Sequence, residues 1–256
     1  MSKIETRNLS YTQGNFTIKD LSIAFPEGQI TGIVGPNGSG KSTLLKLVSR
    51  LLHKESGEII LNDKDIASYK RKELAKQLAM LLQLKEAMPN FTVKELVAYG
   101  RIPYKKTMSG KSNHEDEIID WAIDVTGLTH LSARLVYSLS GGEQQRVRIA
   151  MALAQKTDVL LLDEPTTYLD IGHQMELMGL LKKINHDYGI TIIMVLHELQ
   201  YAAAYCHNMI VMKNGDVYLS GSPQDLLTAS LLRDVYKVEA KIIFDGDYPL
   251  IIPNQI

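Results

Sequence analysis

The chain lacks the features by which secreted and membrane-spanning proteins are recognised. Its 256 residues include a single cysteine, Cys206, so no disulfide can form within the chain and no cysteine-based metal site is possible. No apolar run approaches the ~20 residues that a membrane-spanning helix needs, and the first residues contain no apolar region typical of a signal peptide. A formal net charge of −1 gives no sign of the basic surface that binds nucleic acid. We expect a globular protein without a nucleic-acid partner.

The first segment with a clear chemical role is a glycine-rich loop, which fits G-x-x-x-x-G-K-[ST] over residues 35–42. A short apolar strand is expected before it, over residues 29–34, and a helix after it, from about Ser42. Glycines allow backbone N–H groups to approach phosphate oxygens closely. Lys41 then reaches the β- and γ-phosphates, Ser42 offers a hydroxyl to Mg²⁺, and the helix adds its positive end. A plain turn between core elements is the alternative. The predicted phosphate-binding residues are Gly35, Pro36, Asn37, Gly38, Ser39, Gly40, Lys41, Ser42 and Thr43.

Two acidic residues follow an unbroken apolar run. Residues 159–162 predict a strand covered on both faces, and ligands of parallel sheets bind at the carboxyl ends of the strands. Asp163 and Glu164 stand at that end, and their side chains diverge if the backbone stays extended. We expect Asp163 to hold Mg²⁺ and Glu164 to polarise the water that attacks the γ-phosphate. Two ordinary solvated acids are the alternative.

A helix start stands between these two motifs in the sequence. Ser140 and Glu143 have the S-x-x-E spacing of a capping box. Gly141 and Gly142 leave the backbone N–H groups of the first turn uncovered, which produces an anion site at a helix N-terminus. Without its neighbours this segment is an ordinary capping box.

Residues 139–146 match the signature of the ABC ATPases, and the chain resembles the nucleotide-binding subunit of an ABC transporter over nearly its whole length. The resemblance implies that Tyr11 stacks on adenine and that Gln83 senses Mg²⁺ and contacts the transmembrane partner. It also implies that residues 167–170 form the D-loop, with Asp170 at the dimer interface, and that His197 contacts the γ-phosphate. Taken alone, Tyr11, Gln83 and His197 each have an ordinary structural alternative. Glu198 departs from the Asp that relatives often carry, but the carboxylate is kept.

The implied site is therefore extensive. The catalytic residues are Glu164, His197, Lys41 and Gln83. The ligands of Mg²⁺ are Ser42, Gln83 and Asp163. The other nucleotide contacts are Tyr11, the phosphate loop, Asp170, and Ser140, Gly141, Gly142 and Glu143.

The resemblance also implies an α/β fold, a P-loop NTPase (RecA-like) core with an antiparallel β portion and an inserted ABC-type helical subdomain. The ABC ATPase domain covers residues 1–230, with the core at 1–84 and 156–230 and the helical subdomain at 85–155. A C-terminal extension with short strands covers 231–256. We expect helices at 93–99 and 115–125 and hairpins at 209–219 and 241–251. Arg101, Lys105, Lys106 and Lys111 are expected to form a solvated face.

Function follows from the same resemblance. We expect an ATPase that uses ATP and Mg²⁺ and pairs with a second copy of itself. It should bind permease subunits at the cytoplasmic face of the membrane. A substrate-binding protein is an indirect partner. Residues 100–104, 153–157, 163–171 and 195–197 are similar to the iron–siderophore, haem and cobalamin branch, so a ferric chelate is the expected cargo. Cobalamin, haem and a soluble role in DNA repair or translation stay open. A decayed site would lack Lys41 or Glu164, and both are present.

The segment from Gln83 to Arg101 joins the predicted core to the helical subdomain. We expect it to carry the coupling surface, with Met88, Pro89 and Phe91 as a socket for a permease helix. Local packing of the linker is the alternative.

Overall fold

The computed structural model describes residues 2–83, 90–105 and 113–254. The chain divides into two compact units, Met1–Ser68 with Thr191–Ile256, and Tyr69–Ile190. The α/β fold class is confirmed by both units. The finer division into core, helical subdomain and C-terminal extension stays a prediction. In the part of the chain that the structure describes, no helix is long and apolar enough to cross a membrane.

The first unit contains an antiparallel sheet in the order β2-β1-β4-β5. These strands are β1 (Ser2–Gln13), β2 (Phe16–Pro26), β4 (Ser56–Leu61) and β5 (Lys64–Asp65). Along the carboxyl half of β2, buried Leu21, Ile23 and Phe25 alternate with exposed residues, as a sheet with one covered face requires. This sheet is the antiparallel portion expected from the sequence.

The same unit contains a group of parallel strands. β3 (Ile30–Val34) lies between β8 (Thr191–Val195) and β9 (Asn208–Lys213), parallel to both. Every residue of β3 and β8 is buried, because strands of this kind are covered on both faces. β10 (Asp216–Gly221) pairs with β9 in antiparallel fashion. Asn214 and Gly215 form the turn between them with positive φ angles of 52° and 85°, which confirms the predicted hairpin.

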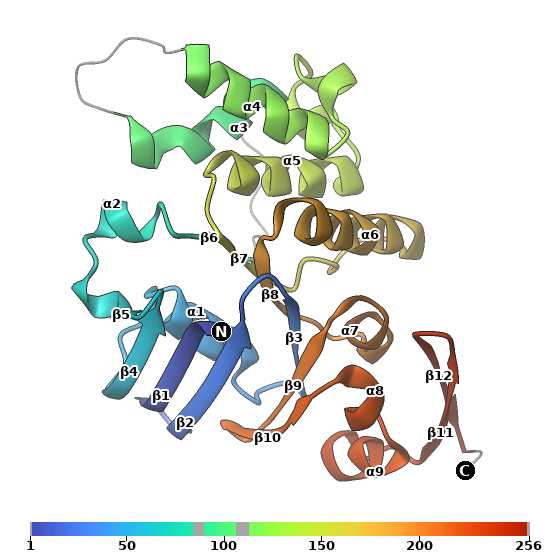
Figure 1. Ribbon diagram of the computed structural model, residues 1–256. Coiled ribbons are helices and arrows are strands. Elements are labelled where there is room, and N and C mark those ends of the chain that lie inside the picture. Colours follow the sequence, from blue (N-terminus) through green and yellow to red (C-terminus); the bar gives the residue numbers. More distant parts are fainter. Residues whose placement is uncertain (1, 84–89, 106–112, 255–256) are drawn as a thin grey trace. The chain divides into compact units, whose positions relative to one another are not determined.

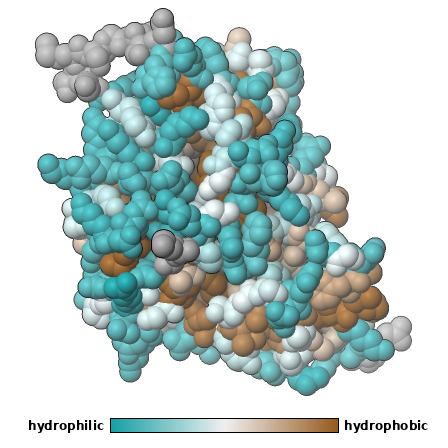
Figure 2. Space-filling view, viewed as in Figure 1, coloured by the Kyte–Doolittle hydropathy of each residue, from teal (hydrophilic) through white to brown (hydrophobic). Residues whose placement is uncertain are grey.

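The helices of the first unit follow its strands. They are α1 (Lys41–Val48), η1 (Ile66–Ser68), α7 (Leu199–Tyr205), α8 (Pro223–Leu226), α9 (Ala229–Leu231) and the π-helical turn η5 (Leu232–Tyr236). The second predicted hairpin is also present, as β11 (Ala240–Asp245) and β12 (Tyr248–Pro253), and β12 packs on α7. Ile243, Leu250 and Ile252 of this hairpin are exposed, and hydrophobic residues gather on the surface in this region of the view (Figure 2).

The second unit is mainly helical (Figure 1). β6 (Leu78–Leu81) and β7 (Val159–Asp163) form a parallel pair. The helices are α2 (Arg71–Leu74), α3 (Val93–Ala98), η2 (Tyr99–Tyr104), α4 (Asn113–Val125), η3 (Thr129–Leu131), η4 (Val136–Ser138), α5 (Gly141–Ala154) and α6 (Ile171–Tyr188). Helix α5 packs on α3 and α4, and its buried side includes Val147, Ala150 and Ala154. The expected helices at 93–99 and 115–125 are thus present.

Arg101 does not belong to a solvated face, so that expectation was wrong for this residue. Its side chain is only 4% exposed. The guanidinium donates to both carboxylate oxygens of Glu115, at 2.5 and 3.1 Å, and to the Ala154 carbonyl at 2.7 Å. It also lies 3.9 Å from the centre of the Tyr104 ring. A buried Arg is stable only when paired in this way, and its partners come from α4 and α5, far away in the sequence.

Candidate functional site

The glycine-rich loop between β3 and α1 is held in a path that only glycine permits at two positions. Gly35 and Gly40 have φ angles of 145° and 101°. A Cβ atom at Gly35 would lie 2.1 Å from the Met212 carbonyl oxygen, and one at Gly40 would lie 2.5 Å from Cζ of Phe16. Residues of β9 and β2 therefore fix the course of the loop at these two positions.

Lys41, the first residue of α1, is folded back onto this loop. Its side chain is buried, and Nζ donates to the carbonyl oxygens of Gly35 at 2.8 Å and Pro36 at 3.1 Å. The hydroxyl oxygen of Ser39 is buried without a hydrogen-bond partner among the described residues. A buried ammonium that donates to two carbonyls, in the same loop as an unsatisfied hydroxyl, is favourable for an incoming anion. The geometry therefore suits phosphate at the predicted place.

The carboxyl end of β7 differs from the sequence-based expectation. Asp163 is the last strand residue and is 7% exposed. Glu164 has φ +52°, in the left-handed region, so the expected extended backbone at this residue was wrong. The strand stops at Asp163, and the chain turns directly through Pro165 into residues 166–170. Left-handed non-glycine residues cost about 1–2 kcal/mol and cluster at functional sites.

The Glu164 carboxylate is oriented by two donors from its own unit. Gln83 Nε2 donates to Oε2 at 2.8 Å, and Thr167 Oγ1 donates to the same oxygen at 3.3 Å. A cavity of about 30 Å³ lies here, and Asp163 and Arg148 are among its lining residues. That volume is large enough for a water, since a site needs roughly 10–15 Å³ and a few polar partners. The sequence singled out Gln83, Asp163 and Glu164, which the structure brings together. Thr167 was named only as part of the D-loop, and its contact with Glu164 was not predicted.

The donor atoms at this end of β7 fit Mg²⁺. Asp163 offers a carboxylate, and Gln83, whose amide nitrogen is used on Glu164, has a carbonyl oxygen for a cation. Magnesium prefers oxygen ligands, keeps several waters and uses one or two carboxylates plus substrate phosphates. No group of three or more His, Cys, Asp or Glu that could hold a metal occurs among the described residues. The third predicted ligand of Mg²⁺, Ser42, lies in the first turn of α1, in the other unit.

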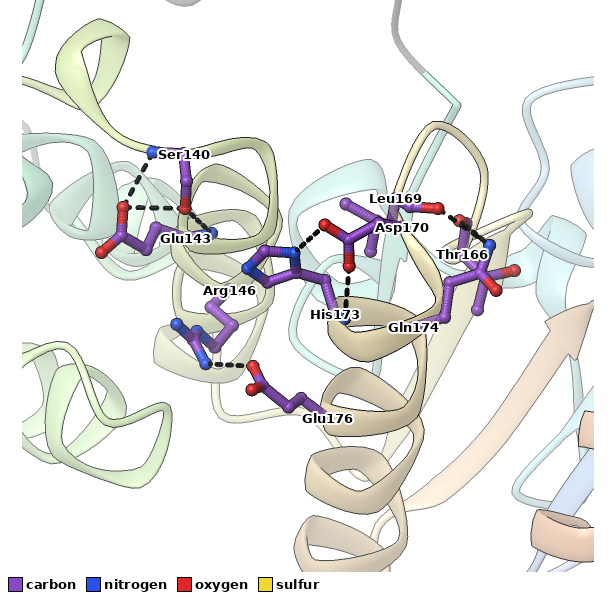
Figure 3. Close-up of polar contacts among 9 residues, drawn as sticks. All are labelled: Ser140, Glu143, Arg146, Thr166, Leu169, Asp170, His173, Gln174 and Glu176. Carbon is purple, nitrogen blue, oxygen red and sulfur yellow. Dashed lines mark hydrogen bonds and ion pairs between the residues drawn. The ribbon is translucent and has the colours of Figure 1, made fainter.

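The start of α5 is the capping box that the sequence predicts (Figure 3). The Ser140 N–H and hydroxyl donate to Glu143 Oε2 at 2.8 and 2.9 Å, and the Glu143 N–H donates to the Ser140 hydroxyl at 3.3 Å. The backbone N–H of Ser140, and then its hydroxyl, hold the pKa of Glu143 below its ordinary value. Gly141 is exposed whereas Gly142 is buried, so the first turn has one open and one covered glycine.

Asp170 caps α6 in the same way. One carboxylate oxygen accepts the His173 N–H at 2.9 Å, and the other lies 2.8 Å from His173 Nδ1 (Figure 3). The N–H of His173, followed by its ring, lowers the pKa of Asp170. His173 was not singled out from the sequence. An N-cap Asp followed three residues later by His was the available signal, but it says nothing about what the ring touches.

The remaining predicted residues are placed separately. Tyr11 belongs to β1 and is 8% exposed, with its hydroxyl donating to Gln13 at 3.1 Å; adenine stacking requires a more open ring, and this role stays a prediction. His197 follows β8 and is exposed. Both lie in the unit of the phosphate loop, whereas the carboxylates and the α5 start lie in the other. Phe91 packs on Tyr99 with ring centres 5.2 Å apart, and Met88 and Pro89 fall outside the described residues.

Comparison with known proteins shows consistent similarities. Residues 18–167 match the family model of the ABC transporter. The iron(3+)-hydroxamate import ATP-binding protein FhuC of Bacillus subtilis is 45% identical over 96% of this chain and 91% of its own length. The petrobactin import ATP-binding protein FpuC of Bacillus anthracis is 44% identical over 94% of this chain and 89% of its own. A solved dimeric bacterial ABC transporter cassette is 29% identical, with a TM-score of 0.72 over 86% of this chain and 98% of that one.

Proposed function

Because the chain belongs to the ABC transporter family, we propose that it hydrolyses ATP to energise import of a ferric siderophore. The observation that supports hydrolysis is the Glu164 carboxylate, oriented by Gln83 and Thr167 beside a cavity of about 30 Å³. The observation that supports the cargo is that relatives at 44% and 45% identity are import ATP-binding proteins for petrobactin and iron(3+)-hydroxamate.

The first part of the mechanism is the exchange of partners at Lys41. The β- and γ-phosphates take the place of the Gly35 and Pro36 carbonyls that Nζ contacts at 2.8 and 3.1 Å. The loop N–H groups and the positive end of α1 add to this attraction. Because the loop is fixed by β9 and β2, little reorganisation accompanies binding.

The second part is the attack of water. Gln83 and Thr167 both donate to Oε2 of Glu164 and so orient its carboxylate, which is the proposed acceptor of a proton from the attacking water. Ser42, Gln83 and Asp163 would hold Mg²⁺, which would supply neutralising charge at the phosphates. His197 is the proposed contact of the γ-phosphate. Phosphoryl transfer depends mainly on such positioning and electrostatics.

We further propose that two copies complete each other's sites. The start of α5 offers Ser140, Gly141 and Gly142 to the nucleotide bound by the other copy, and Asp170 lies at that interface. Similarity to a dimeric cassette at 29% identity supports this pairing. Light scattering of a Glu164→Gln variant should show monomers that pair when ATP is added; a permanent monomer contradicts the shared site. Permease subunits at the cytoplasmic face of the membrane, and through them a substrate-binding protein, are the further proposed partners.

Hydrolysis is tested with Glu164→Gln and the matched variant Glu117→Gln, which changes an exposed glutamate of α4. Glu164→Gln should bind MgATP normally but hydrolyse it about two to four orders of magnitude more slowly, as loss of a general base does. Glu117→Gln should keep the wild-type rate. Wild-type turnover in Glu164→Gln rejects the assignment of the base.

Cargo is tested in a deletion strain that has no paralogous ATPase. We expect it to lose growth on ferric siderophore as sole iron source and to keep growth on free iron salts, with restoration by the wild-type gene. Normal growth on the siderophore removes the iron proposal and leaves an importer ATPase for another cargo.

A further inference from the structure

A histidine on α6, His173, contacts Asp170 (Figure 3) and lies against Gly142 at the start of α5, the two places that we assign to the dimer interface. Its Nδ1 atom lies 2.8 Å from one oxygen of Asp170, while its own N–H donates to the other oxygen at 2.9 Å. A carboxylate only accepts, so Nδ1 carries the proton and the ring is held in one orientation. The Asp170 carboxylate and the His173 ring therefore form one rigid group.

The other edge of this ring lies against Gly142 in the first turn of α5. A Cβ atom at Gly142 would come within 2.3 Å of Cδ2 and 2.7 Å of Cγ of His173. Such distances are far inside van der Waals contact, so only glycine fits while the ring is there. The neighbouring Gly141 has a similar but looser contact, since a Cβ atom there would lie 4.0 Å from Cδ2 of Leu169.

The backbone at Gly142 has no need of glycine for its own sake. Gly142 is the second residue of α5 and its φ angle is not positive, so a residue with a side chain can adopt this conformation. Within this chain, the space for that side chain is taken by the imidazole of His173. The sequence pair of glycine and histidine is thus explained by contact across two helices, and not by helix geometry.

Ordinary packing does not require this group either. Helices α5 and α6 are already joined by the ion pair of Arg146 with Glu176 at 3.2 Å. The turn before α6 is held by Gln174, which donates to the carbonyls of Thr166 and Leu169 at 3.2 and 3.0 Å. The cap of α6 needs only one oxygen of Asp170. The hydrogen bond between Asp170 and the His173 ring, and the contact of that ring with Gly142, are therefore not needed for the cap or for joining the two helices.

We propose that His173 is a positioning residue that sets the place of the Gly141–Gly142 backbone according to the place of Asp170. The proposal rests on the function proposed above, in which that backbone meets the phosphates of the second copy's ATP. A displacement of Asp170 at the interface moves the ring, and the ring moves the glycines. His173 touches no nucleotide in this scheme and acts through Gly142.

Two substitutions remove one contact of His173 each, either the hydrogen bond with Asp170 or the ring contact with Gly142. His173→Asn keeps a donor at the position of Nδ1 but removes the ring, and His173→Phe keeps a ring but removes the donor. The matched controls are His186→Asn and His186→Phe. His186 lies on the same helix, has Nδ1 2.9 Å from Asp187, and is 86% exposed.

Both His173 variants should lower kcat about ten- to a hundredfold, the effect of misplacing a group by about 1 Å. The affinity of the chain for ATP should change less than about twofold, since Lys41 and the phosphate loop are untouched. ATP should also pair these variants less well in the Glu164→Gln background. The His186 variants should behave as wild type in every assay.

Gly142→Ala tests the ring contact directly, through melting temperatures. The methyl group should lower Tm clearly in the wild type and much less in His173→Asn, because contacting residues are not additive. Equal lowering in both backgrounds overturns the contact.

Three further results reject the proposal. Wild-type kcat in both His173 variants shows that the link is not used. A loss of kcat that equals the loss of folded protein shows a purely structural role. An absence of ATP hydrolysis in the wild-type chain, measured first, rejects the proposed function and this inference with it, whereas wild-type hydrolysis with unaffected variants rejects the inference alone.

Discussion

Gly40→Ala is the substitution for which the structure yields the clearest magnitude. Gly40 is the N-cap of α1, with φ 101° and ψ 8°. An alanine there takes on left-handed backbone, at about 1–2 kcal/mol. Its Cβ atom would also lie 2.5 Å from Cζ and 3.3 Å from Cε2 of Phe16, and overpacking of this kind costs about 1–3 kcal/mol. The expected loss in free energy of unfolding is therefore about 2–5 kcal/mol.

Gly38→Ala is the matched control within the same loop. Gly38 also has a positive φ, 77°, but a Cβ atom there would meet nothing within 4 Å. Only the backbone cost of about 1–2 kcal/mol should remain. Urea unfolding of both variants and the wild type measures the difference. ATP affinity should fall further in Gly40→Ala, since Lys41 follows directly. Equal destabilisation by the two substitutions refutes the argument from Phe16.

Three other predictions concern separate parts of the molecule. Hydrogen bonds from Ser140 lower the pKa of Glu143 from 4.5. The ionised carboxylate therefore stabilises the fold above that value, and this contribution is lost as pH falls through the lower, folded-state pKa. The free energy of unfolding, measured across acid pH, should depend less on pH in Glu143→Gln than in the wild type, and identical curves contradict this. Tyr11→Ala should weaken ATP binding by about 1–3 kcal/mol and Tyr11→Phe should keep most of it, whereas lower stability with equal ATP affinity in all three forms makes Tyr11 a core residue. Phe91→Glu should abolish siderophore uptake with an unchanged ATPase rate of the purified subunit; intact uptake removes Phe91 from the coupling surface.

Features set by neighbours in sequence were predictable, and features set by distant neighbours were not. The Ser140–Glu143 cap and the turn at Asn214 and Gly215 depend on residue types a few positions apart, and both are present. The left-handed backbone of Glu164 depends on how the chain leaves β7, so the apolar run could not reveal it.

The same reasoning applies to the buried guanidinium of Arg101 and to the contact of the His173 ring with Gly142. The charge pattern around Arg101 gave no hint of Glu115 and the end of α5. Likewise, the GG pair of the signature gave no hint that His173 fills the space beside Gly142. Contacts of this kind come from packing between elements, which local pattern does not encode.

The cap of α5 has a consequence for how an empty site is kept stable. Ser140 has one hydroxyl proton, and it is given to Glu143 at 2.9 Å. Until a phosphate arrives, the protein's own carboxylate thus serves as the resident anion of this helix end. A phosphate oxygen at Ser140 accepts that proton only if the hydroxyl rotates away from Glu143. In the proposed pair of copies, the nucleotide would compete with Glu143 for this one proton, while the Glu143 carboxylate keeps the Ser140 backbone N–H at 2.8 Å.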